Sequence, residues 1–237
     1  MDIFLIESTQ TSSVALDTYD ALGIAYPVHA FNAPKIVMDF VKRLPEANAM
    51  PAFIISTAGA HHFLNFASSK LLIKKLTQKG FDVFYDRQFT MPSNFIVQYD
   101  DRKVKQIISE TDEQIDESVR ELARQVRLSR KSGFFADIAA FLGRAEWFGA
   151  KLTGKFLYAD KNCTRCGLCA TNCPNRNISV DEMGVRFKCH CGLCMRCIHL
   201  CPKSAINVRR PFRFIVPDAL AQKTSDSFRQ PKHPVCK

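Results

Sequence analysis

Cysteine is the residue type whose spacing stands out in this chain of 237 residues, because all ten cysteines fall after residue 160. Eight of them form two runs with the same spacing, Cys-x-x-Cys-x-x-Cys-x-x-x-Cys-Pro. The first run reads CTRCGLCATNCP over 163–174, and the second reads CGLCMRCIHLCP over 191–202. Thiolates are soft metal ligands, so the repeat raises the question of which metal group needs four thiols twice.

The spacing favours iron–sulfur clusters. Three cysteines at intervals of three residues can surround one corner of a cube of iron and sulfide, with the fourth ligand coming from elsewhere. In two-cluster bacterial ferredoxins the fourth cysteine of each run binds the other cluster, and the proline after it turns the chain away. We therefore expect one [4Fe-4S] cluster on Cys163, Cys166, Cys169 and Cys201, and a second on Cys191, Cys194, Cys197 and Cys173. Gly167 and Gly192 are expected to let the backbone pass close to sulfide.

Zinc is the alternative metal, but zinc sites commonly use two Cys-x-x-Cys pairs separated by a longer spacer. A third cysteine at the same interval, followed by Cys-Pro, is poorly explained by zinc. Cys189 is an alternative ligand only if the register of the second run shifts, and Cys236 is expected to be a bystander. His190 and His199 are expected at the surface or beside the ligands rather than among them.

Positive charge is concentrated in the cysteine-rich part. Residues 1–158 carry 19 Lys and Arg against 18 Asp and Glu, a net +1, and residues 159–237 carry 14 against 5, a net +9. Two oxidised clusters with their thiolates contribute about −4, which leaves roughly +5 in the second part. This excess of positive charge in the second part of the chain predicts a redox partner with an acidic docking face. No nucleic acid is expected as a partner, because no nucleic-acid-binding module is recognisable.

Membrane insertion and secretion are both disfavoured. The chain has no stretch of about 18 uncharged apolar residues that would span a membrane. Its start, MDIFLIESTQ, lacks the basic segment and long apolar core of a signal peptide. We therefore expect a cytoplasmic protein, in which disulfides are rare and clustered cysteines more often bind metal.

The first part of the chain alternates between strand-like and helix-like patterns. Short apolar runs predict strands at 3–6, 21–26, 52–57 and 81–85. One helix is expected after Pro34, which suits a first helical position, and another over 62–79, where Gly80 should end it. The alternation predicts an α/β layer with a mostly parallel sheet.

Further helices are predicted after this sheet. Thr111 and Gln114 are expected to form a capping box that opens a helix. Residues 133–155 predict an aromatic-rich helical connector whose apolar face is buried. A membrane-surface helix is the alternative there, disfavoured because Asp137 and Glu146 interrupt the apolar pattern.

The chain resembles fused proteins of anaerobes in which a flavodoxin-like domain precedes a two-cluster bacterial-type ferredoxin. The ferredoxin motifs cover about 156–208, and the front half resembles the family through GIAYPVHAFNAPKIVMDFVKRLP, IISTAGAHHFLNFASSKLLIKKLTQKG and FTMPSNF. The resemblance implies an α/β plus α+β fold. Its parts are a flavodoxin-like domain at 1–132, the connector at 133–155, a ferredoxin domain at 156–210 and a polar tail at 211–237.

Flavin binding is where the chain departs from that family. Members open with a strand and a loop rich in Thr, Ser and Gly that cradles the FMN phosphate, whereas MDIFLIES aligns with their second strand. We therefore expect the first strand and helix to be absent, through a late start codon or a fragment, and FMN to bind weakly or not at all. The loops Pro27–Asn32 and Thr57–His62 are expected to flank the flavin ring position, with Gly59 allowing a tight turn. Their histidines, His29, His61 and His62, are expected to be polar loop residues.

An electron carrier is the function that these features predict. It would pass single electrons through two [4Fe-4S] clusters, coupled to a flavin in the first domain where one is bound. A flavin/iron–sulfur oxidoreductase acting on a small substrate is the first alternative, although no acid–base pair identifies a substrate site. A zinc-stabilised module that binds nucleic acid is the remote alternative.

Overall fold

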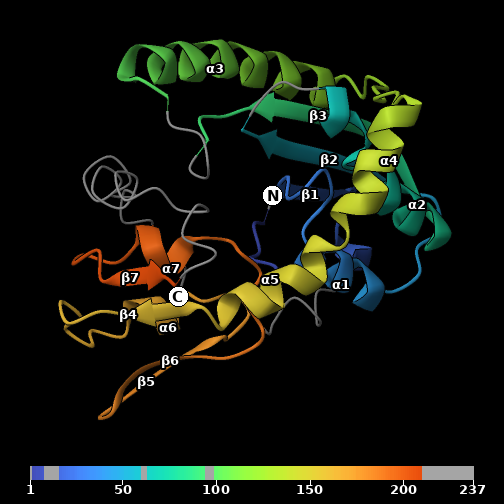
Figure 1. The fold of residues 1–237 in the computed structure, drawn as a ribbon. Coiled ribbons are helices and arrows are strands. Elements are labelled where there is room, and N and C mark those ends of the chain that lie inside the picture. Colours follow the sequence, from blue (N-terminus) through green and yellow to red (C-terminus); the bar gives the residue numbers. More distant parts are fainter. Residues whose placement is uncertain (1, 8–15, 60–62, 94–98, 210–237) are drawn as a thin grey trace. The chain divides into compact units, whose positions relative to one another are not determined.

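The protein divides into two compact units in a computed structural model that describes residues 2–7, 16–59, 63–93 and 99–209 (Figure 1). Unit 1 comprises 1–93 and 99–148, and unit 2 comprises 94–98 and 149–237. The boundary falls within helix α5 (Glu146–Gly154), inside the segment expected to be the connector. The tail at 211–237, with Cys236, lies outside the described residues.

Unit 1 is built on a parallel sheet of three strands in the order β1-β2-β3 (Figure 1). The strands are β1 (Leu22–Pro27), β2 (Met50–Ala58) and β3 (Phe81–Thr90). They coincide with three of the predicted strands, so the predicted α/β layer is confirmed. The fourth prediction, a strand at 3–6, is wrong: this segment is not in a strand, and Ile3 is 82% exposed. An apolar run becomes a strand only beside a hydrogen-bonding partner, and within the described residues β1 pairs with β2 alone.

Helices α1 (Lys35–Arg43) and α2 (Lys70–Gln78) pack into the main hydrophobic core on one face of the sheet. The helix expected around Pro34 is present as α1, but Pro34 is its N-cap rather than its first residue. The helix predicted over 62–79 is divided into the 3-10 helix η3 (Phe63–Ala67) and α2. Gly80 ends α2 as predicted, with φ +84°, and a β-carbon there would overlap the carbonyl oxygen of Ala47. A further 3-10 helix, η2 (Leu16–Thr18), precedes β1.

Helix α3 (Asp101–Ala123) packs against β3, and its start shows that the predicted capping box is wrong. The side chain of Asp100 accepts a hydrogen bond from the backbone N–H of Lys103 at 2.7 Å, so this carboxylate caps the helix. Thr111 lies in the middle of α3, where it is buried and its Oγ1 donates to the carbonyl of Thr90 at 2.6 Å. The cap of the helix, Asp100, therefore lies eleven residues before Thr111, the cap that the Ser/Thr-x-x-Gln pattern indicated.

Helix α4 (Phe134–Gly143) buries alanines rather than its large apolar side chains, contrary to expectation. Ala136 and Ala140 are buried, whereas Phe134 and Phe141 are 73% and 66% exposed. The buried face lies against η3, and the Nδ2 of Asn32 donates to the carbonyl of Ala140 at 2.7 Å. Such a close approach of backbones favours small side chains on the buried face.

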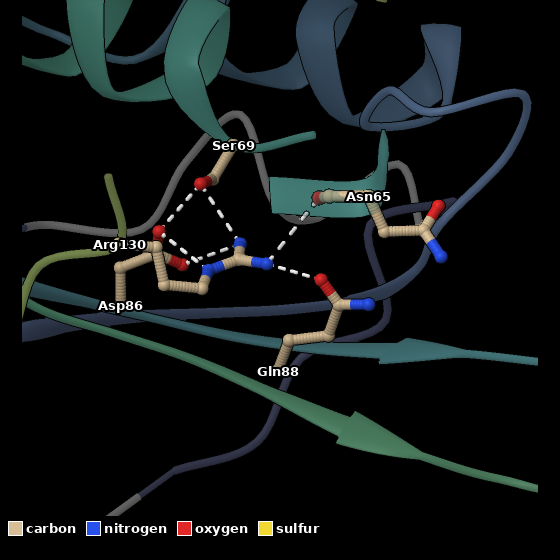
Figure 2. A network of polar contacts seen from close by, with 5 residues as sticks. All are labelled: Asn65, Ser69, Asp86, Gln88 and Arg130. Carbon is tan, nitrogen blue, oxygen red and sulfur yellow. Dashed lines mark hydrogen bonds and ion pairs between the residues drawn. The ribbon is translucent and has the colours of Figure 1, made fainter. Parts of the chain in front are cut away.

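A buried ion pair fastens the segment between α3 and α4 to β3. Figure 2 shows the guanidinium of Arg130 between the side chains of Ser69, Asp86 and Gln88 and the carbonyl of Asn65. The guanidinium makes two bonds to the Asp86 carboxylate, Nε–Oδ2 at 3.0 Å and Nη2–Oδ1 at 2.9 Å. Asp86 is only 1% exposed, so its charge is compensated inside the protein.

The described part of unit 2 contains two small antiparallel sheets and two one-turn helices. Strand β4 (Leu157–Ala159) pairs with β7 (Ile206–Val208), and β5 (Ile178–Asp181) pairs with β6 (Gly184–Phe187). The helices are α6 (Leu168–Thr171) and α7 (Arg196–His199), each beginning inside one cysteine run. In the described part of unit 2, one buried hydrophobic cluster comprises Leu157, Met195, Ile198, Ile206 and Val208, and Ala150, Ile178 and Ala205 are buried as well. Of the helices in the described part of the chain, none is long and apolar enough to cross a membrane.

Candidate metal centre

Two cavities in unit 2 are each lined by four cysteines. Cavity 1 is lined by Cys163, Cys166, Cys169 and Cys201. Cavity 2 is lined by Cys173, Cys191, Cys194 and Cys197. Each set takes three cysteines from one run and the fourth from the other run. The structure thus brings together the same two groups of four that the sequence assigned to the two clusters.

The backbone of the two runs repeats as closely as their sequence does. Each run has left-handed residues two and four positions after its first cysteine and three positions after its fourth. The pairs are Arg165 and Leu193 (φ 54° and 50°), Gly167 and Met195 (79° and 58°), and Arg176 and Ser204 (48° and 46°). Non-glycine residues seldom adopt this conformation, so its recurrence at equivalent positions marks a shared tight winding around each cavity.

Backbone N–H groups point at cysteine sulfurs in the same repeating pattern. The N–H of Arg165 donates to Cys163 Sγ, and the N–H of Leu193 donates to Cys191 Sγ, both at 3.4 Å. The fourth cysteines accept in the same way, Cys173 from Asn177 and Cys201 from Ala205, both at 3.2 Å. Such donors stabilise the thiolate form of a sulfur, which is the form that binds metal.

The two glycines of the runs have different roles. Gly167 has φ +79°, and a β-carbon there would meet no atom within 4 Å, so conformation is what requires glycine. Gly192 is not left-handed; a β-carbon at that position would come within 2.5 Å of Asn175 Nδ2. Gly192 therefore leaves space for the side-chain amide of Asn175. The residue equivalent to Gly192 in the first run is Thr164.

Burial affects the thiols of cavity 2 most. It raises the pKa of Cys191 to about 11, and burial also raises the pKa values of Cys194 and Cys197. In cavity 1, burial raises the pKa of Cys169, while Cys166 is exposed. A bound cation would displace the protons, because coordination deprotonates a thiol outright.

Asn177 and Gly154 support cavity 2 and were not anticipated from the sequence. Asn177 is 1% exposed, and its Oδ1 accepts from the N–H of His190 at 2.6 Å. A β-carbon on Gly154, at the end of α5, would overlap the β-carbon of Cys191. Neither residue belongs to a recognisable pattern, because each is defined by a contact between segments distant in sequence.

The remaining candidates lie away from both linings. Cys189 is exposed and lines neither cavity, and His190 is exposed as expected. His199 is partly buried and also lines neither cavity. In the described part of the chain, no three His, Cys, Asp or Glu side chains form a group suited to a single metal ion.

The two loops expected beside a flavin ring start at the same edge of the sheet of unit 1. The N–H of Val28 donates to the carbonyl of Thr57 at 2.7 Å, and His29 pairs with Asn32 across a tight turn. Burial lowers the pKa of His29. Gly59 faces Ser93, with 3.1 Å from an added β-carbon to the Ser93 β-carbon. His61 and His62 lie outside the described residues.

No family model, curated protein or solved structure matches this chain. The case for its function therefore depends on the residues and their geometry.

Proposed function

We propose that the protein is an electron carrier of the two-cluster ferredoxin type, with a [4Fe-4S] cluster in each cavity of unit 2. The observation that carries this proposal is the exchange of the fourth cysteine. Cys201 lines cavity 1 with the first run, and Cys173 lines cavity 2 with the second. That exchange is typical of two-cluster bacterial ferredoxins.

The residues present suit such a group. In each cavity four thiols surround a space, which a cluster of several irons can fill with one thiolate on each iron. The two spaces are similar in size, about 360 and 430 Å³ including the parts open to solvent, which is in keeping with one kind of occupant. The N–H groups that point at sulfur would share the negative charge of the ligands.

The cavity linings favour a carrier over a substrate-specific enzyme. Besides cysteines they consist of small, aliphatic and amide side chains with the cations Arg165, Lys203 and Arg196. Bound clusters would supply one-electron chemistry, and the protein would hold them, exclude water to different degrees and set their potentials. The net positive charge of the second part of the chain suits an acidic redox partner.

Analysis of protein purified without oxygen tests the proposal. We expect about eight iron and eight sulfide per chain, because two four-iron clusters carry that number. We further expect Cys173→Ala to remove the cluster held by Cys191, Cys194 and Cys197 while the other cluster remains. Cys189→Ala is the matched control, because Cys189 is an exposed cysteine that lines neither cavity.

Iron and sulfide counts, EPR spectra of the reduced variants and circular dichroism together decide the outcome. A folded protein with zinc and no sulfide would refute the clusters. If Cys173→Ala disturbed only the cluster of the first run, the exchange of ligands would be wrong.

A further inference from the structure

The residues that line the two cavities differ in how exposed they are. Half of the residues around cavity 1 are exposed, namely Thr164, Arg165, Cys166, Leu168, Pro202 and Lys203. Among the residues around cavity 2, Arg196 is the one that is exposed. The two cysteine runs therefore repeat in sequence and in backbone conformation, but the exposure of the residues around their cavities differs.

Sequence differences between the runs explain the unequal exposure. Where the first run has Thr164 and Arg165, the second has Gly192 and Leu193. Gly192 lies against Asn175, and the end of α5 at Gly154 packs directly on Cys191. The cover over cavity 2 is thus formed by segments of unit 2 itself.

Exposure and charge act on reduction in the same direction. Reducing a cluster adds a negative charge, which water and nearby cations stabilise and a low-dielectric surrounding penalises. Two cations, Arg165 and Lys203, line cavity 1, whereas Arg196 is the one cation in the lining of cavity 2. A group bound in cavity 1 is therefore the easier one to reduce.

We propose, on the basis of the function proposed above, that cavity 1 is the exchange site. An acidic redox protein docks over its rim at Cys166, and the cluster there has the higher reduction potential of the two. In each exchange one electron passes between the partner and this cluster. One is oxidised and the other reduced by one electron, with no bond made or broken.

The rim is suited to an acidic partner. The Nη1 of Arg165 donates to the backbone carbonyl of Glu182 at 2.8 Å, which fixes the guanidinium beside the cavity. Two acids lie near the contact between Arg165 and the Glu182 carbonyl. The carboxylate of Asp181 is paired with Arg186, and Glu182 is the exposed acid. Lys203 adds a second exposed cation from the opposite run.

Redox titration monitored by EPR tests the order of the potentials. Cys166→Ser and Cys194→Ser alter equivalent ligands of cavities 1 and 2, and oxygen is a harder ligand than sulfur. We expect Cys166→Ser to shift the higher midpoint and Cys194→Ser the lower. If a variant loses its cluster, the surviving midpoint belongs to the other site and gives the same assignment. Equal midpoints, or the reverse assignment, would overturn the proposal.

Docking is tested by stopped-flow reduction with an acidic flavodoxin as the probe. Arg165→Glu combined with Lys203→Glu should slow the reaction about tenfold at low salt, with rates converging at high salt. Lys155→Glu combined with Lys188→Glu is the matched control, since both lysines are exposed, belong to unit 2 and line neither cavity. Reduction midpoints measured for each variant show whether a slower reaction comes from weaker docking or from a changed driving force for electron transfer.

An equal slowing in both double variants, or a rate independent of salt, would refute docking at this rim. A protein without iron and sulfide refutes the function proposed above. A protein with both clusters but the opposite order of potentials refutes only the assignment of cavity 1.

Discussion

At the scale of single residues, Gly154 determines how closely α5 approaches cavity 2. A methyl group at this position would overlap the β-carbon of Cys191, so we expect Gly154→Ala to displace this cysteine and destabilise unit 2 by about 1–3 kcal/mol. Gly149→Ala, in the same helix, should be neutral or slightly stabilising, because its β-carbon meets no atom within 4 Å. Denaturation midpoints and cluster content compare the two. Equal effects would show that α5 does not pack on Cys191.

His29 links the stability of unit 1 to pH. Burial lowers its pKa in the folded state, so the unfolded chain takes up the proton first as the pH falls. The stability from neutral His29 is therefore present above the ordinary pKa of about 6.5 and is lost as the pH falls through the lower folded value. We expect His29→Gln to flatten the loss of stability between about pH 7 and pH 5. Urea midpoints measured across this range check the slope; an unchanged slope would contradict the prediction.

The cysteines that line each cavity could be grouped from the sequence, because the repeated spacing suggested that each run shares its fourth cysteine with the other run. The residues whose left-handed conformations shape the backbone around the cavities could not all be predicted from the sequence. Arg165, Leu193 and Met195 adopt left-handed conformations without being glycine. Aligning the two runs with each other would have shown only that these positions are equivalent. Their conformation is imposed by the surrounding contacts rather than by their own preferences.

At the scale of elements, the pair of Arg130 and Asp86 holds the segment after α3 on the edge of β3. The N–H of Leu128 donates to the carbonyl of Phe84 at 2.9 Å, so this segment continues the hydrogen bonding of the sheet. Removing the guanidinium with Arg130→Met would leave the buried Asp86 carboxylate without its charge partner, with the hydroxyl of Ser69 still donating to it, at a cost of about 3–5 kcal/mol.

Arg127→Met provides the comparison, because Arg127 pairs with Asp82 on the surface of the same strand. Its effect should be far smaller, since water replaces an exposed ion pair. Urea unfolding of unit 1 measures both changes. Similar losses in the two variants would mean that the buried network of Figure 2 does not carry the stability assigned to it.

Elements with a clear hydrophobic period were predicted and those decided by packing were not. The three strands of the sheet and α1 follow from short apolar runs and a one-sided apolar stripe. The segment 3–6 has the same apolar character but no described strand beside it. In α4 the expected pattern of burial is reversed. Contact with η3 places alanines on the buried face and leaves Phe134 and Phe141 exposed. Such choices depend on neighbours distant in sequence.

At the scale of the whole molecule, the two units differ in the size of their buried hydrophobic cores. Unit 1 has an extended core in which α1 and α2 cover the sheet. In the described part of unit 2 the buried hydrophobic cluster has five residues, with cysteines packed against it, and the other buried apolar residues are Ala150, Ile178 and Ala205. A core of this size contributes little stability by itself, so small domains commonly need metals or disulfides as internal links.

With the clusters proposed above, this contrast predicts that removing iron unfolds unit 2 and leaves unit 1 folded. Clusters bind the folded arrangement of thiols and not the unfolded chain, so their binding free energy adds to the stability of unit 2 alone. We expect hydrogen exchange, followed by mass spectrometry, to show lost protection over 156–209 after treatment with acid and chelator. Protection of β1, β2 and β3 should persist. The Cys189→Ala variant, treated in the same way, controls for the loss of a thiol outside the cavities. Retained protection over 156–209 without iron would mean that the small core is sufficient to keep unit 2 folded. The metal would then not be needed for its stability.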